Sequence, residues 1–341
     1  MISKSQTLIT GVYRCGSEFV SQLLNCHPQI SVSLYGVNAL RFIFDRYDPI
    51  SENYLRAIDD LEKRLRIKYN QSLNKNDIIQ KIKRCEPIDY GRFYDIAVHS
   101  LYMKYPAIHW AEKNQLLWRE IPKFLDTMPD GKAIQVVRDP RSILLSFKHY
   151  TYSSPPAYLE AVFNCLDSMQ YALKYIKNLP KDKFYCVKYE DIATNPKSCI
   201  EKIWNFLELE GVGNIEDQSN WINAFGMKWH ANSSFHSNTD LKPFDVESSI
   251  NRWKTGLQST ELSFVQEVCK DVMKAFDYNI SKVSSNWLSI IKLFAHDDTL
   301  VKYFRNWILT GEGIEAFPNN PLNPQNWRDG HNKPYREENV K

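Results

Sequence analysis

The chain has 341 residues, of which 43% are hydrophobic and 24% are charged, so its composition is that of a folded protein and not of a disordered one. Its formal net charge of +3 is too small to indicate nucleic acid as a partner, so any anion-binding site must be local. The seven cysteines have no CxxC or Cys/His spacing, which argues against a disulfide framework and against a zinc site.

The sequence predicts a soluble, cytoplasmic protein. A first β-strand is expected within a few residues of Met1, which leaves no room for a signal peptide or a membrane anchor. No apolar run approaches the ~18 residues that a helix needs to span a bilayer. From residue 318 to residue 341 the chain is polar and rich in Pro and Asn, so we expect one domain over residues 1–317 followed by a polar tail.

The most informative stretch is a strand, a turn and a helix near the start of the chain. Residues 7–12 (TLITGV) are apolar and β-branched, as in a strand buried on both faces, and SEFVSQLLNCHP predicts a helix over residues 17–28. Gly11 and Gly16 have the GxxxxG spacing of a loop whose backbone N–H groups hold a phosphate. A purely structural turn is the alternative.

This loop differs from the Walker A loop of nucleotide triphosphatases. Ser17 stands where the Walker lysine would follow Gly16, and Arg14 supplies a cation before the glycine instead. We interpret Cys15 as a small residue that fits the tight turn, with a reactive thiol as the alternative.

Further along the chain, predicted strands alternate with predicted helices. Strands are expected at residues 30–33, 115–122, 133–137 and 184–191, and helices at residues 142–150, 158–178 and 196–209. This alternation predicts an α/β fold, a three-layer sandwich in which helices flank both sides of a central parallel sheet.

Residues 38–110 are inserted between the loop and the next core strand. The spacing of charges in NYLRAIDDLEKRLRIKYN and NDIIQKIKR predicts solvated amphipathic helices, and a mobile cap over the site is the second possibility. Aromatic residues become frequent towards Trp110, where they serve either the core or the lining of an acceptor pocket.

Polar residues follow the predicted strands at their carboxyl ends, where ligands gather in parallel sheets. Arg119 and Glu120 end the strand predicted at 115–122, and Arg138 follows the strand that runs into the sequence RDPR. Asp139 is expected to cap the helix that begins there, and Ser146 lies about two turns farther on.

Together these segments resemble the sulfotransferase family that uses 3′-phosphoadenosine 5′-phosphosulfate (PAPS). TGVYRCGSEFVSQLLNCHP is similar to the 5′-phosphosulfate loop of that family, often written RSGTT with LLxxHP farther along, and IQVVRDPRSILLSF is similar to its 3′-phosphate segment, VRDPRxxxxS. VKYEDIATNP with IWNFLEL, NSSF (232–235) and NRWKTGL (251–257) resemble later segments of the family, in the same order. The resemblance implies a sulfotransferase fold related to that of the P-loop nucleotide triphosphatases.

The resemblance also implies a donor site with two anion-binding parts. The residues implied for the 5′-phosphosulfate are Arg14, Cys15, Gly16, Ser17, Glu18 and Phe19. Those implied for the 3′-phosphate are Arg138 and Ser146, reinforced by Arg252 and Lys254, for which a solvated charge pair is the alternative. Arg14 is further expected to stabilise the leaving group, and the mechanism of the family requires no metal. Trp253 is interpreted as a packing residue, with stacking on the adenine as the alternative.

The general base is predicted from the same resemblance. Glu120 stands two residues before Pro122, where cytosolic members of the family carry a His, so we expect the Glu120 carboxylate to take the proton of the acceptor hydroxyl. A salt bridge between Glu120 and Arg119 or another cation is the alternative role. The other candidates for the base are His99, His109 and His230.

The reaction expected from the resemblance is transfer of a sulfuryl group from PAPS to the hydroxyl of a carbohydrate or small metabolite, with adenosine 3′,5′-bisphosphate (PAP) as product. Two other functions stay open. One is a P-loop kinase of a small hydroxyl compound, with Asp139 as its apparent magnesium ligand. The other is a nucleotide-binding protein that has lost the chemistry. The sequence predicts neither the identity of the acceptor nor an oligomeric state.

Overall fold

The structure is a computed structural model of the chain. It describes residues 3–33, 36–85, 87–103, 107–150, 156–211, 213–215, 221, 244–283 and 286–315. The predicted polar tail at 318–341, His230 and the NSSF segment at 232–235 lie outside these residues.

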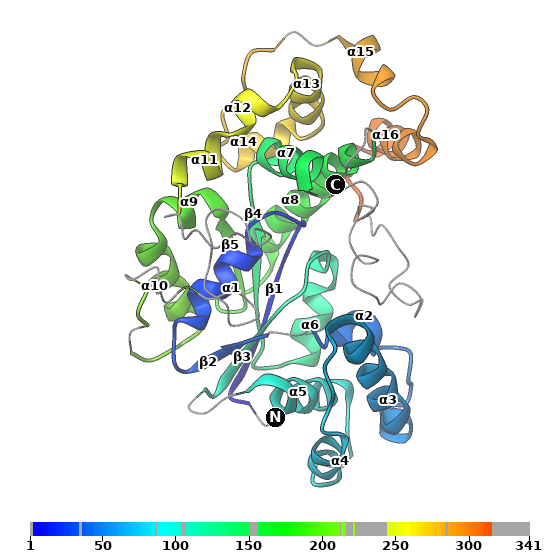
Figure 1. The fold of residues 1–341 in the computed structure, drawn as a ribbon, viewed down its shortest axis with the longest axis vertical. Coiled ribbons are helices and arrows are strands. Elements are labelled where there is room, and N and C mark those ends of the chain that lie inside the picture. Colours follow the sequence, from blue (N-terminus) through cyan, green and yellow to red (C-terminus); the bar gives the residue numbers. More distant parts are fainter. Residues whose placement is uncertain are drawn as a thin grey trace.

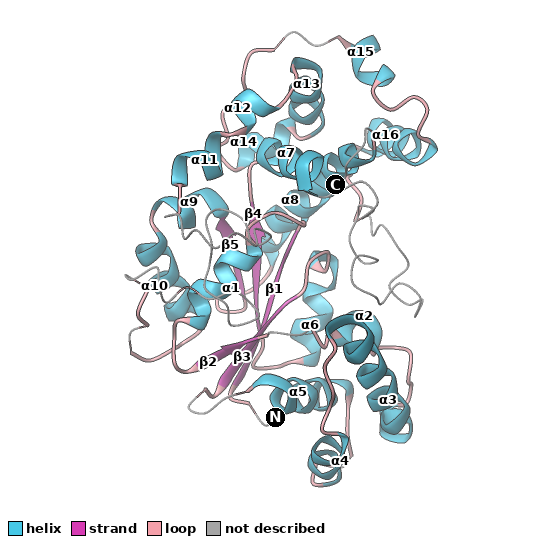
Figure 2. Ribbon diagram, viewed as in Figure 1, coloured by secondary structure: helices cyan, strands magenta, loops and turns pink. Residues whose placement is uncertain are grey.

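Five parallel strands form one central sheet in the order β2-β3-β1-β4-β5 (Figure 2). The strands are β1 (Ser5–Gly11), β2 (Ile30–Val32), β3 (His109–Lys113), β4 (Lys132–Val137) and β5 (Phe184–Lys188). The central strand β1 pairs with β3 on one side and with β4 on the other, and all seven of its residues are buried. This arrangement confirms the predicted α/β fold with a parallel sheet.

Helices cover both sides of the sheet, as predicted (Figure 1). On one side α1 (Ser17–Asn25) packs against α10 (Pro196–Phe206). On the other side α6 (Ile121–Thr127) packs on β4, and α8 (Glu160–Asn178) packs on β4 and β5. The remaining short elements around the sheet are η1 (Trp118–Glu120), α7 (Pro140–Tyr150), η2 (Ala157–Leu159) and α9 (Tyr189–Thr194).

One predicted strand was wrong. Residues 115–122 form no strand; they turn into η1 and then α6, and the strand of this region, β3, lies earlier. Leu116 has a left-handed backbone, with a φ of 56°, and its N–H donates to the carbonyl of Gly11, so the chain leaves the sheet before Pro122. The sequence HWAEK of β3 was missed because its charged residues hide a short strand that is buried on both faces.

The insertion at 38–110 is helical, as predicted. It contains α2 (Ala39–Phe42), α3 (Ile50–Tyr69), α4 (Lys75–Lys83) and α5 (Tyr90–Tyr102). Phe93, Tyr94 and Trp110 are fully buried, which assigns them to the core and not to the lining of an exposed pocket.

The C-terminal part of the described chain packs over α7 and α8 (Figure 1). It contains α11 (Val246–Asn251), α12 (Trp253–Gly256), α13 (Ser259–Val268), α14 (Lys270–Ala275), α15 (Trp287–Lys292) and α16 (Asp298–Thr310). Residues far apart in the sequence are thereby brought to the end of the sheet that carries the RDPR segment. Throughout the described ranges, no helix combines the length and the apolar character that crossing a membrane demands.

Candidate active site

The loop after β1 lies where open parallel sheets bind their ligands. The chain leaves β1 towards β2 and leaves β4 towards β5, in opposite directions, so the carboxyl edge between β1 and β4 is a topological switch point. In the loop, Arg14 and Gly16 have left-handed backbones, with φ values of 70° and 97°. A Cβ at Gly16 would lie 2.1 Å from the Tyr189 ring, so only glycine fits here.

Cys15 fills the inside of this turn. Its side chain is fully buried, and its N–H donates to the carbonyl of Val12 at 3.1 Å. Burial raises the pKa of the Cys15 thiol, and the nearby Ser17, Arg138 and Lys113 oppose that rise. The thiol is therefore a packed, neutral group, in agreement with the interpretation of Cys15 as a small residue that fits the turn.

The first turn of α1 contributes mainly backbone to the loop. The Phe19 side chain packs among aromatic rings, with the ring centroid of Phe244 at 4.9 Å and that of Trp221 at 5.2 Å. Glu18 forms an ion pair with Lys113, the last residue of β3. Lys113 is a cation beside the loop that the sequence reasoning missed, because β3 itself was missed.

Arg14, Arg138 and Ser146 meet in one cluster. The Nε of Arg14 donates to the Ser146 hydroxyl at 2.9 Å, and Nη1 of Arg138 donates to the Arg14 carbonyl at 2.9 Å. Arg138 and Ser146 are buried, with 6% and 1% of their surface exposed. The guanidinium carbon of Arg138 lies 4.0 Å from the centre of the Tyr189 ring. The structure thus joins residues of the two segments that the sequence assigned to separate anion sites.

Residues 249–256 run along the beginning of α7. The Ser249 carbonyl accepts a hydrogen bond from Nη2 of Arg138, and the Ile250 carbonyl accepts one from the Ser142 hydroxyl at 3.1 Å. Farther along, a Cβ on Gly256 would lie 2.6 Å from the Leu145 side chain. This segment carries the half-buried Arg252 and the exposed Lys254 to the same end of α7 as Arg138.

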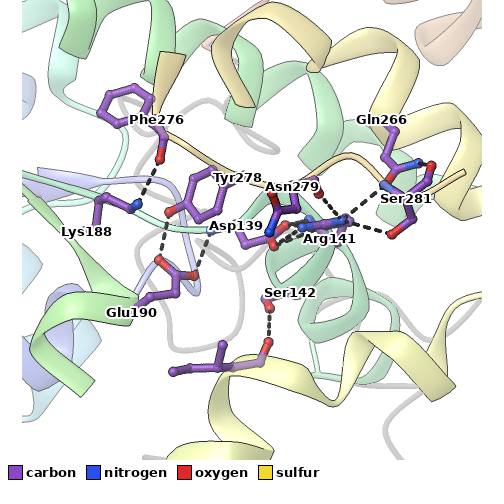
Figure 3. A network of polar contacts seen from close by, with 11 residues as sticks. Asp139, Arg141, Ser142, Lys188, Glu190, Gln266, Phe276, Tyr278, Asn279 and Ser281 are labelled. Carbon is purple, nitrogen blue, oxygen red and sulfur yellow. Dashed lines mark hydrogen bonds and ion pairs between the residues drawn. The ribbon is translucent and has the colours of Figure 1, made fainter. Parts of the chain in front are cut away.

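The RDPR segment is held by a buried polar network (Figure 3). The Asp139 carboxylate accepts the N–H of Arg141 at 2.9 Å, so Asp139 caps α7 as predicted. Glu190 accepts the N–H of Asp139 at 3.0 Å and the hydroxyl of Tyr278 at 2.7 Å. Burial raises the pKa of Glu190, and Arg138 and the Asp139 N–H limit that rise. The segment is thereby fixed to both α9 and the C-terminal part of the chain.

Glu120 lies on the other flank of the loop, in a group of charged residues. It is half-buried and directly precedes α6. Nη2 of Arg41 donates to the carbonyls of Gln115 and Leu116, which places the Arg41 guanidinium beside the loop. Burial lowers the pKa of Arg41, and among the groups that oppose this shift are Tyr13, Glu315 and Glu120. These three residues therefore lie within electrostatic range of Arg41.

Arg119 is bound by carboxylates other than Glu120. Its Nη2 lies 2.6 Å from the buried Asp167, and its Nε lies 3.5 Å from Glu315. The pKa of Glu315 is raised to about 8, mainly by burial and in part by Asp167 and Glu120, while Arg41 and Arg119 oppose the rise. Arg41 and Glu315 were not predicted as site residues, because no local sequence pattern indicates that they meet here.

Of the three histidines named as candidate bases, the structure describes His99 and His109, and both are poorly placed for that role. His109 is the first residue of β3 and pairs with Ser5 and Ile30, so it lies at the end of the sheet opposite the loop. Burial lowers its pKa to about 4. His99 lies on α5 with its Nδ1 at 3.4 Å from the Lys81 ammonium, and burial lowers its pKa too.

Comparison with known proteins agrees with this geometry. Residues 7–212, which contain most of β1 and all of β2 to β5, match the model of the Sulfotransferase family. Carbohydrate sulfotransferase 3 of Tetronarce californica is 27% identical over 168 residues, which are 44% of this chain and 36% of that protein. The match therefore spans only about a third of the length of this relative.

Solved structures share the fold. The sulfotransferase domain from the Synechococcus PCC 7002 olefin synthase has a TM-score of 0.54 and 15% identity, over 82% of this chain and 96% of that one. The sulfotransferase domain from the curacin biosynthetic pathway has a TM-score of 0.50 and 18% identity, over 81% of this chain and 98% of that one. Because the family match covers more than half of its residues, the chain belongs to the Sulfotransferase family.

Proposed function

We propose that this enzyme transfers a sulfuryl group from PAPS to a hydroxyl. The observation that carries the proposal is the cluster of Arg14, Arg138 and Ser146 at the switch point, beside a loop with a left-handed glycine. The Nε of Arg138 is buried and has no hydrogen-bond partner within the described part of the chain. A buried guanidinium N–H without an acceptor is costly, and a phosphate oxygen would satisfy it.

PAPS carries a 5′-phosphosulfate and a 3′-phosphate on one nucleotide, and the site offers a separate group of residues for each of them. The N–H groups of Gly16, Ser17, Glu18 and Phe19, in the loop and the first turn of α1, would hold the 5′-phosphosulfate. Arg138 and Ser146 would hold the 3′-phosphate, with Arg252 and Lys254 at its edge. PAPS supplies the sulfuryl group, and Arg14 stabilises the negative charge that develops on the leaving oxygen.

We propose Glu120 as the general base. The acceptor oxygen would attack the sulfur in line, so that a new S–O bond forms while the S–O bond to the 5′-phosphate breaks and PAP leaves. The O–H bond of the acceptor breaks, and its proton passes to the Glu120 carboxylate. The half-buried position of Glu120 beside Arg41, on the flank of the loop away from Arg138, supports this role. In the alternative role, a salt bridge, Arg119 has less support as the partner because its guanidinium is bound to Asp167 and Glu315, and Arg41 is the other cation with which Glu120 would pair.

A carbohydrate or a small hydroxylated metabolite is the proposed acceptor. The name of the relative from Tetronarce californica, a carbohydrate sulfotransferase, supports the first of these. The kinase alternative loses its magnesium ligand, since both carboxylate oxygens of Asp139 accept hydrogen bonds from Arg141, at 2.9 Å and 2.7 Å.

The proposed reaction is tested by incubating the enzyme with sulfur-labelled PAPS and a panel of hydroxyl acceptors that includes chondroitin and simple phenols. We expect labelled product and PAP in equal amounts with at least one acceptor. ATP with Mg²⁺ serves as the competing donor, and phosphorylation of the same panel would overturn the proposal.

A further inference from the structure

Arg141 is a cation in the anion-binding segment that is fully occupied by protein groups (Figure 3). Only 3% of its surface is exposed. Its Nε and Nη2 donate to the Asp139 carboxylate, and its Nη1 donates to the Gln266 side chain at 3.1 Å and to the Asn279 carbonyl at 2.8 Å. With each guanidinium nitrogen engaged in this way, Arg141 is not placed to bind a phosphate itself.

The face of the Arg141 guanidinium carries a second contact. Its central carbon lies 3.8 Å from the centre of the Trp253 ring, and Trp253 is buried, with 6% of its surface exposed. This distance is well within the range of a cation–π interaction, and burial strengthens it. Arg141 thus fixes the position of Trp253 against α7.

Trp253 lies between the two cations predicted to reinforce the 3′-phosphate site, Arg252 and Lys254. Four residues before it, the Ser249 carbonyl is bound by Arg138. The segment from 249 to 253 is therefore anchored at one end on Arg138 and at the other on Arg141, and Arg252 stands inside this span.

We propose that Arg141 is a positioning residue of the donor site, which holds Trp253 so that Arg252 is presented to the 3′-phosphate next to Arg138. This inference rests on the proposed PAPS donor. It assigns to the second arginine of RDPR a task distinct from that of the first: Arg138 contacts the phosphate, and Arg141 orders the segment that brings another cation to it.

The test is calorimetric binding of two probes, PAP and adenosine 5′-monophosphate, which lacks the 3′-phosphate. Arg141→Lys keeps the charge and loses both the two-pronged pair with Asp139 and the flat stacking surface. We expect it to weaken PAP binding roughly 10-fold and 5′-monophosphate binding less than about 2-fold. Trp253→Leu, which leaves the Asp139 pair in place, is expected to act in the same direction and covers the case in which Arg141→Lys does not fold.

A double-mutant cycle shows whether Arg141 acts through Arg252. In an Arg252→Ala background, Arg141→Lys is expected to weaken PAP binding by less than about 2-fold, because the residue it positions is gone. Arg64→Lys is the matched control: Arg64 is 2% exposed, donates to the Gly36 and Val37 carbonyls and lies 4.2 Å from the Phe42 ring, away from the donor segments.

Two results would overturn the inference. One is an equal loss of affinity for both probes on Arg141→Lys and on Trp253→Leu, which would show general damage to the nucleotide site. The other is a loss of PAP affinity on Arg141→Lys that is as large in the Arg252→Ala background as in the wild-type background. A wild-type enzyme that binds PAP no more tightly than the 5′-monophosphate would instead overturn the proposed donor, and the inference with it.

Discussion

Arg14 reaches from the loop after β1 to Ser146 on α7, where its Nε donates to the serine hydroxyl at 2.9 Å. The sequence pattern assigned these residues to opposite ends of the donor. In the structure the loop arginine and the helix serine share a hydrogen bond, while the Arg14 carbonyl is held by Arg138. The two segments proposed to bind the donor are therefore one connected unit, and we expect a change in either to affect the other.

Ser146→Ala removes the acceptor of the Arg14 guanidinium and the hydroxyl proposed for the 3′-phosphate. We expect it to weaken PAP binding by roughly 10-fold, because a hydrogen bond between charged and polar groups is lost at a buried position. Calorimetry measures this. Ser168→Ala is the control, since Ser168 is buried and also accepts from a side chain, Gln135, at 3.0 Å. PAP affinity that is unchanged by Ser146→Ala would exclude the serine from the donor site.

Glu120→Ala tests the general base. If Glu120 takes the acceptor proton, turnover should fall by about 10²–10⁴ while PAP affinity stays within a few-fold of wild type. Glu120→Gln should behave alike, since an amide accepts no proton. Turnover that survives either substitution within a few-fold would remove Glu120 from the chemistry.

Gly16→Ala is expected to destabilise the fold strongly. The new Cβ would lie 2.1 Å from the Tyr189 ring, in a backbone with a φ of 97°. Gly211→Ala is a matched control, because Gly211 has a similar φ of 92° but nothing within 4 Å of the added atom. Denaturant unfolding should show a loss of about 1 kcal/mol for Gly211→Ala and about 3 kcal/mol or more for Gly16→Ala. Equal losses would mean that backbone strain alone makes the glycine necessary.

Glu315 makes stability depend on pH. The pKa of Glu315 is raised from 4.5 to about 8 in the folded protein, so folding favours the protonated form of its carboxyl group. That contribution to stability is complete below pH 4.5 and is lost as the pH rises through 8. We expect the free energy of unfolding of wild type, relative to Glu315→Gln, to fall by on the order of 1–3 kcal/mol across this window. The exposed Glu312, changed to Gln, should leave the wild-type pH dependence intact; identical curves for wild type and Glu315→Gln would contradict the account.

Local patterns predicted most of the fold. β1 and β4 are short segments centred on apolar and β-branched residues, and α7 begins with a capping Asp139 and a following Pro140, features that a few adjacent residues define. The strand β3 was not predicted because Glu112 and Lys113 interrupt its apolar run. Both side chains are held by tertiary contacts with residues far away in the chain, Glu112 with Asn38 and Lys113 with Glu18.

The candidate site likewise contains some residues that local sequence patterns predict and others that only the fold brings together. Arg14, Arg138 and Ser146 belong to two short motifs and were identified from them. Arg41 and Glu315 stand more than 270 residues apart and come together near Glu120 only because α2 and the segment after α16 both reach residues 115–119. Contacts of this kind leave no spacing pattern in a single sequence.

The most direct test of the central claim is calorimetric binding of PAP, compared with ATP plus Mg²⁺, to wild type and to Arg138→Ala. We predict tight binding of PAP that Arg138→Ala weakens about 10- to 150-fold, since a charge-assisted hydrogen bond contributes about 1.5–3 kcal/mol. Binding of ATP with Mg²⁺ and not of PAP, or PAP affinity indifferent to Arg138→Ala, would contradict the assignment of this site to a sulfuryl donor.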